Sequence, residues 1–117
     1  MNERLGRLVE RLHSKSERRE IQWQKSLPDA FETSFPNYTV EVGQISGSPE
    51  STTYLKIYNE EGEVIEFVQD QELRSGAFYS SDDDKYQTKL RETYQMARRV
   101  ALGTEEAIDN LIMALED

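Results

Sequence analysis

The strongest structural signal in this 117-residue chain is the segment Tyr54-Leu55-Lys56-Ile57-Tyr58-Asn59-Glu60-Glu61-Gly62-Glu63-Val64-Ile65-Glu66-Phe67-Val68. Two runs that alternate between apolar and polar residues flank a turn that Gly62 closes, because glycine adopts a left-handed backbone conformation at little cost. The pattern predicts a β-hairpin. In the register that this turn favours, Asn59 pairs with Glu63.

That register would divide the side chains of the hairpin between two faces. One face would be apolar, with Ile57 opposite Ile65 and Leu55 opposite Phe67. The other face would carry Tyr54, Lys56, Tyr58, Val64, Glu66 and Val68. Tyrosine is enriched at protein interfaces because its ring is large and its hydroxyl tolerates water. These six residues form the candidate interface, and cover by the N-terminal helix or the 70–81 connector is the alternative.

Further strands are predicted upstream of the hairpin. Residues 30–35 alternate in the same way, Pro36-Asn37 supplies a turn, and a second alternating run begins at Tyr38 and fades near Ile45. The sequence therefore predicts a four-stranded, mainly antiparallel β-meander over residues 30–68. Before it, the alternation around Trp23 indicates a short extended piece that places the indole on the core.

Helical periodicity marks both ends of the chain. Residues 1–20 carry one apolar stripe, formed by Leu5, Leu8, Val9 and Leu12. Residues 82–116 read as a helical pair that Gly103 interrupts, with Ser81 or Asp82 as the first cap and Thr104 as the second. The second helix of this pair has its own apolar stripe, formed by Ala107, Ile108, Leu111, Ile112 and Leu115. We expect one α+β domain over residues 1–117, two-layered, with one N-terminal and two C-terminal helices on one face of the sheet.

Composition narrows the function classes. The chain has no cysteine, which excludes disulfides, thiolate metal sites and cysteine nucleophiles. No apolar run approaches the length of a membrane span, and the N-terminus lacks the apolar core of a signal peptide. We therefore expect a cytoplasmic protein with no membrane partner.

Five segments carry a family resemblance, namely Ile21-Gln22-Trp23, Phe31–Phe35, Asn37–Val40, Ile57–Val64 and Tyr94–Gly103. Together they resemble a group of small bacterial proteins that combine an N-terminal helix, a β-meander and a C-terminal helix pair and have no established function. The resemblance implies the same fold and implies no catalytic or binding residue. The connector over 72–84 is longer here than in the pattern of that group.

Candidate catalytic and metal-binding residues have simpler structural interpretations. His13 has no carboxylate or nucleophile beside it in the sequence, as a general base would need. The triplet Asp82-Asp83-Asp84 lacks the alternating ligands and central glycine of a calcium loop, which favours helix capping. The acidic turn 60–63 is typical of a solvated hairpin tip. We expect no catalytic residue, no metal site and no cofactor, and hence no enzyme.

Two segments that could be taken for nucleotide- or DNA-binding motifs do not have the residues that such motifs need. Residues 43–48 lack the pattern of a phosphate-binding loop. The helix–Gly103–helix arrangement resembles a DNA-reading motif, but residues 104–117 contain five acidic residues and no Lys or Arg, so phosphates would repel the second helix. We expect no direct nucleic-acid binding.

Charge is distributed unevenly along the chain, whose net charge is −9. Residues 1–25 contain seven Lys or Arg and four Asp or Glu, whereas residues 26–117 contain seven and nineteen. One interpretation is a basic N-terminal helix that docks on an acidic body; the other is an acidic surface that meets a basic partner. Both are compatible with the sequence.

The leading functional prediction is a non-enzymatic protein–protein interaction module, an accessory or adaptor component of a bacterial assembly. Two alternatives remain open. One is an acidic inhibitor, antitoxin-like or immunity-like, of a basic nucleic-acid-binding protein. The other is a small metal-dependent hydrolase. A protein partner is expected in the first two cases, and a homodimer is an open alternative.

Overall fold

The computed structural model describes residues 3–45, 52–73 and 83–116, and the side chains of all of these except 83 and 84. Its elements are α1 (Glu3–Glu17), β1 (Gln24–Leu27), β2 (Ala30–Phe35), β3 (Tyr38–Ile45), β4 (Thr52–Tyr58), β5 (Val64–Gln69), the 3-10 helix η1 (Asp70–Leu73), α2 (Asp83–Ala101) and α3 (Thr104–Glu116). The α+β class is as predicted. The proposed caps Ser81 and Asp82 lie outside the described residues.

The sheet has five antiparallel strands in the order β1-β2-β3-β4-β5, not the four predicted. The missed strand is β1, whose four residues Gln-Lys-Ser-Leu are mostly exposed and include three polar ones. A short strand at the edge of a sheet buries little, so it shows no alternation that sequence analysis could detect. The other four strands form the predicted meander.

The predicted turn of the β4–β5 hairpin is confirmed, but the register beyond it is wrong. Asn59 N donates to Glu63 O over 3.0 Å, Gly62 has a φ of 80°, and Tyr58 lies opposite Val64. A β-bulge at Ile65 then shifts the pairing by one residue, so that Leu55 lies opposite Val68 instead of Phe67.

The bulge exchanges the two faces of β5. Val68, at 4% exposure, joins Leu55 in the core, whereas Phe67 is 37% exposed on the opposite face beside Lys56. The physical reason is that the helices cover one face only, and one extra residue suffices to invert which side chains of a strand reach them. Turn chemistry specifies the first pair, and packing specifies the rest.

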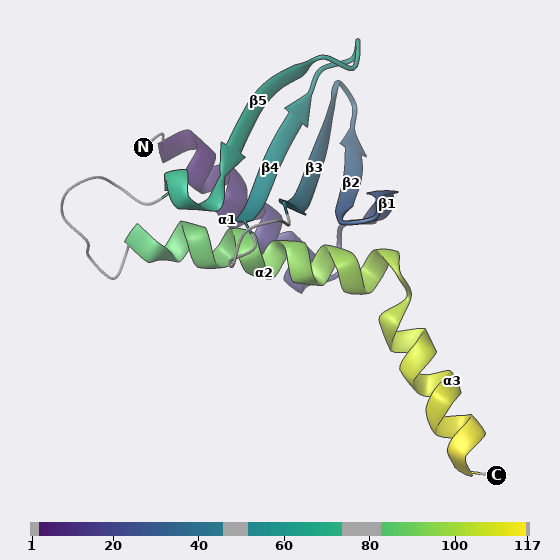
Figure 1. Cartoon of the computed structure of the whole chain (residues 1–117). Coiled ribbons are helices and arrows are strands. Elements are labelled where there is room, and N and C mark those ends of the chain that lie inside the picture. The colour runs from purple at the N-terminus through teal and green to yellow at the C-terminus, as the bar shows by residue number, and fades with distance from the viewer. Residues whose placement is uncertain (1–2, 46–51, 74–82, 117) are drawn as a thin grey trace.

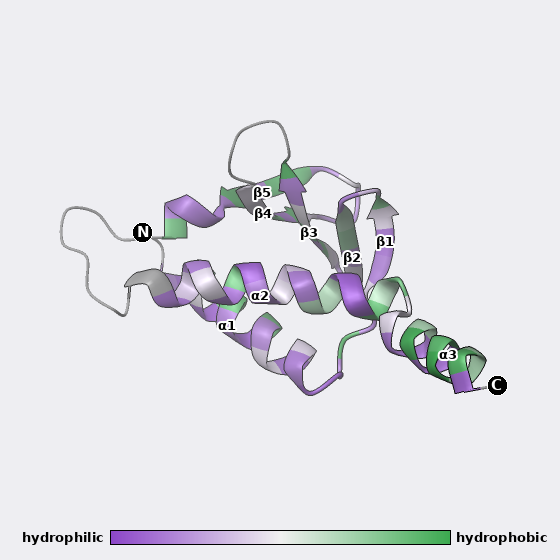
Figure 2. Ribbon diagram, turned by 60° about the horizontal axis from the view of Figure 1, so that its bottom comes forward, coloured by the Kyte–Doolittle hydropathy of each residue, from purple (hydrophilic) through white to green (hydrophobic). Residues whose placement is uncertain are grey.

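The helices α1 and α2 lie on the same side of the sheet and pack against each other (Figures 1 and 2). Between these helices and the sheet lies one apolar core, to which α1, α2 and strands β2 to β5 all contribute. Trp23 belongs to this core, as predicted, and its indole Nε1 donates to the buried Ser16 Oγ over 2.9 Å. This bond ties the end of α1 to the segment that leads into β1.

The last helix does not join this layer. Gly103, with a φ of 64°, separates α2 from α3, and α3 extends away from the domain toward the C-terminus (Figure 1). No residue of α3 is buried. The prediction that all the helices pack on one face of the sheet is therefore wrong for α3.

Candidate interaction surface

The structure separates the six residues of the candidate interface. Tyr54, Lys56, Tyr58 and Val64 lie on the outer face of the sheet, opposite α1 and α2, whereas the bulge turns Glu66 and Val68 toward the helices. Tyr54 is buried although it lies on the outer face, and Val68 belongs to the core. The six residues therefore do not form one exposed surface, because the predicted register placed β5 the wrong way round.

On the outer face, the tyrosines turn inward to hold a buried carboxylate. Glu41 is only 3% exposed, and its Oε2 accepts a 2.8 Å hydrogen bond from the Tyr54 hydroxyl. Its Oε1 accepts longer bonds from Tyr58, at 3.3 Å, and from Ser26, at 3.4 Å. In the sequence, Glu41 is an ordinary polar residue of an alternating strand. The pairing of β3 with β4 brings Tyr54 and Tyr58 close to it.

Burial changes the acidity of these phenols. Burial and the hydrogen bond to Glu41 raise the pKa of Tyr54 far above its usual value, and burial with the nearby charge of Glu41 raises the pKa of Tyr58. The Tyr54 ring also fills the space above Gly43, where a Cβ would lie only 2.5 Å from the ring. The Lys56 ammonium lies 5.4 Å from the centre of the Tyr54 ring and 5.7 Å from that of Phe67. These contacts indicate that the cluster around Tyr54 stabilises the fold.

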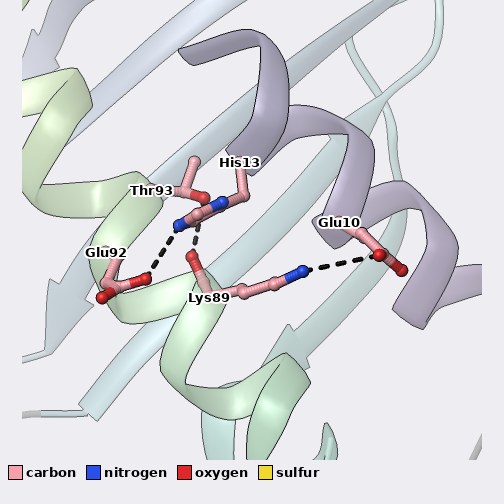
Figure 3. Close-up of polar contacts among 5 residues, drawn as sticks. All are labelled: Glu10, His13, Lys89, Glu92 and Thr93. Carbon is pink, nitrogen blue, oxygen red and sulfur yellow. Dashed lines mark hydrogen bonds and ion pairs between the residues drawn. The ribbon is translucent and has the colours of Figure 1, made fainter. Parts of the chain in front are cut away.

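Polar contacts clamp α1 to α2, as Figure 3 shows. His13 Nε2 lies 2.8 Å from Glu92 Oε1, and Lys89 Nζ lies 3.4 Å from Glu10 Oε1. Sequence analysis found no carboxylate for His13 because Glu92 is 79 residues away. The hydroxyl of Thr93, the residue after Glu92, donates to the backbone carbonyl of Lys89 over 2.7 Å.

A hollow of about 800 Å³ lies beside this clamp and is lined by His13, Glu17, Gln44, Thr53, Thr88, Arg91, Glu92, Gln95 and Met96. It is a wide, open depression, whereas ligand sites enclose most of their ligand. Among the residues that the structure describes, no three His, Cys, Asp or Glu side chains gather to hold a metal ion. The Asp82-Asp83-Asp84 triplet lies outside the described side chains.

A second buried carboxylate connects η1 to α2. Asp70 is fully buried, and its Oδ2 lies 2.6 Å from Nε of the half-exposed Arg91. Its Oδ1 has no hydrogen-bond partner within the described part of the chain. The pair anchors the end of β5 onto α2, and Arg91 supplies the compensating charge that burial of Asp70 requires.

The helix α3 carries a stripe of exposed apolar side chains. Ile108, Leu111, Ile112 and Leu115 recur at helical spacing and are 42 to 83% exposed. Figure 2 shows the hydrophobic character of this projecting helix. Sequence analysis recognised the stripe but assigned it to the core, since a periodic pattern does not reveal what the apolar face meets.

The first turn of α3 is held against the domain by ion pairs. Glu105 Oε1 lies 2.7 Å from Arg99 and 3.9 Å from Arg19, and the hydrogen bond and charge of Arg99 lower the pKa of the Glu105 carboxyl. Beside this turn, a groove of about 440 Å³ is lined in part by Ile21, Met96 and Val100. The base of α3 is thus anchored, and the rest presents its apolar stripe to solvent.

None of the described helices is both long enough and apolar enough to cross a membrane. Comparisons of the chain with family models, with curated proteins and with solved structures find no match in any of the three.

Proposed function

We propose that this protein is a non-enzymatic protein–protein interaction module, an adaptor component of a bacterial assembly, and that α3 is its docking element. The observation that carries the proposal is the exposed apolar stripe of α3. Exposed apolar patches that are contiguous and bordered by polar residues mark interaction sites, whereas single exposed apolar residues need no explanation.

The geometry of α3 suits helix-in-groove binding. In that mode an amphipathic helix lays apolar anchors at positions i, i+3, i+4 and i+7 into a hydrophobic groove. Ile108, Leu111, Ile112 and Leu115 have this spacing. The ion pairs of Glu105 with Arg99 and Arg19 support the first turn, so a partner does not have to order the whole helix.

Capture from a native lysate of the source cells tests the proposal. The tagged full chain is compared with Leu111→Glu, which places a charge at the centre of the stripe, and with Asn110→Glu. The latter adds the same charge on the opposite side of α3 and is the matched control. Both positions are exposed, so both variants should fold like the wild type, as circular dichroism would show.

We expect the wild type and Asn110→Glu to retain the same proteins and Leu111→Glu to lose them. Central interface side chains typically contribute enough that their loss lowers affinity by about 30-fold or more. A capture profile of Leu111→Glu that equals the wild-type profile would contradict the proposed role of α3.

A further inference from the structure

The two edges of the apolar stripe on α3 differ in chemistry. At about 100° per residue, Glu105, Asp109 and Glu116 fall in one row along one edge, which we call the acidic edge. The other edge carries Ala107 and Ala114. Glu106 and Asn110 lie on the far side of the helix, away from the stripe.

Within the described residues, two of the three acids on this edge have no ionic partner. Glu105 is paired with Arg99 and Arg19, but neither Asp109 nor Glu116 has a cation within ion-pair distance in the part of the chain that the structure describes. Residues 104–117 also contain no Lys or Arg of their own. Whatever covers the apolar stripe therefore has to neutralise or solvate these two carboxylates.

A second copy of the chain fits this requirement poorly. An antiparallel pair of α3 helices about a two-fold axis would bring the two acidic edges together, and like charges so placed repel. A parallel pair would place both domains at the same end of the helix pair. Each helix is only about 20 Å long, so the two domains would compete for the same space. Self-association through α3 is disfavoured in both arrangements.

A membrane surface fits no better. Helices that lie in the lipid interface carry Lys and Arg on their polar face, which attract anionic headgroups. The polar residues of α3 are acidic or neutral, so an anionic bilayer would repel them. The remaining occupant is a protein whose groove carries the opposite charge.

We propose that α3 docks into an apolar groove of a different protein and that one edge of this groove carries basic side chains facing Asp109 and Glu116. The opposite edge of the groove lies close to the backbone of α3, because Ala107 and Ala114 are small. This inference rests on the proposed function of α3 and names its partner by chemistry.

The test applies charge variants to the proteins that α3 captures, defined as those that Leu111→Glu loses and Asn110→Glu retains. Asp109→Asn with Glu116→Gln removes the two free acids of the acidic edge. The matched control, Glu106→Gln with Glu61→Gln, removes two exposed charges of the same sign, one from the far side of α3 and one from the tip of the β4–β5 hairpin. Retained protein is quantified over a series of salt concentrations.

We expect the acidic-edge variant to bind about ten-fold more weakly at low salt, as two lost rim ion pairs would cause, and the control to bind like the wild type. The wild type should lose affinity as salt rises, whereas the acidic-edge variant should be less sensitive. Equal binding by the two double variants would overturn the inference while leaving α3 as the docking element.

Two further measurements test the other two occupants, a second copy of the chain and a membrane. Sedimentation of the purified protein should show a monomer, and a dimer that Leu111→Glu dissociates would overturn the inference in favour of a second copy. Flotation with vesicles containing anionic lipid should leave the protein unbound, and binding that depends on Leu111 would overturn it in favour of a membrane. If nothing is captured through α3 and both measurements are negative, the proposed function itself fails.

Discussion

At the residue scale, the clearest result is that the tyrosines of the outer face serve the fold. Tyr54 and Tyr58 donate to Glu41, and burial raises the pKa of both phenols. A tyrosine whose folded pKa exceeds its unfolded value stabilises the fold fully below the unfolded pKa, and this contribution is lost as the pH rises toward the folded pKa.

The fold should therefore lose stability in alkali. Above pH 10, the ordinary tyrosine pKa, the unfolded chain releases phenolic protons that the folded chain keeps, so the free energy of unfolding falls. Urea denaturation between pH 8 and 12 measures this slope. Tyr54→Phe should make the slope shallower. An equal slope in the variant would show that Tyr54 titrates normally.

The Asp70–Arg91 pair leads to a second residue-scale prediction. Arg91→Leu leaves the fully buried Asp70 carboxylate without its cation, and we expect a loss of about 2 kcal/mol in unfolding free energy. Adding Asp70→Asn to Arg91→Leu should restore part of this loss, because it removes the uncompensated charge. Chemical denaturation provides the measurement, and Arg11→Leu, at an exposed position of α1, is the control, expected to change little.

At the element scale, two positions require glycine for different reasons, Gly62 for its backbone conformation and Gly43 for lack of space. Gly62→Ala should cost about 1 kcal/mol, because φ is +80° there while a Cβ would meet nothing within 4 Å. Gly43→Ala should cost more, about 1–3 kcal/mol, because its Cβ would lie 2.5 Å from the Tyr54 ring. Combining Gly43→Ala with Tyr54→Leu should reduce this second cost. Equal costs for the two single substitutions, measured by denaturation, would contradict the steric argument.

The elements also differ in how well their sequences predict them. The hairpin turn and the helix break at Gly103 follow from local backbone chemistry, so both were predictable. The bulge at Ile65 depends on which side chains the helices cover, and the strand β1 depends on its pairing with β2. Neither leaves a local signal, because a bulge residue and a short polar edge strand resemble ordinary sequence.

At the scale of the whole molecule, the domain should be independent of α3. No residue of α3 is buried, and its described ion pairs to the domain involve Glu105 alone. A chain that ends at residue 103 should therefore fold and melt within about 5 °C of the full chain. A larger fall in the melting temperature by calorimetry would mean that α3 packs on the domain.

The sequence by itself determined the helices, the meander, the hairpin turn and the absence of cysteine chemistry, because these depend on periodicity, glycine and composition. It also identified the apolar stripe of α3. Only the tertiary structure decided that Val68 is buried and Phe67 is not, that Tyr54 and Tyr58 hold Glu41, and that His13 meets Glu92. It also left the stripe of α3 uncovered. These facts depend on contacts between residues far apart in the chain, and a local pattern specifies which side chains share a face but not what that face meets.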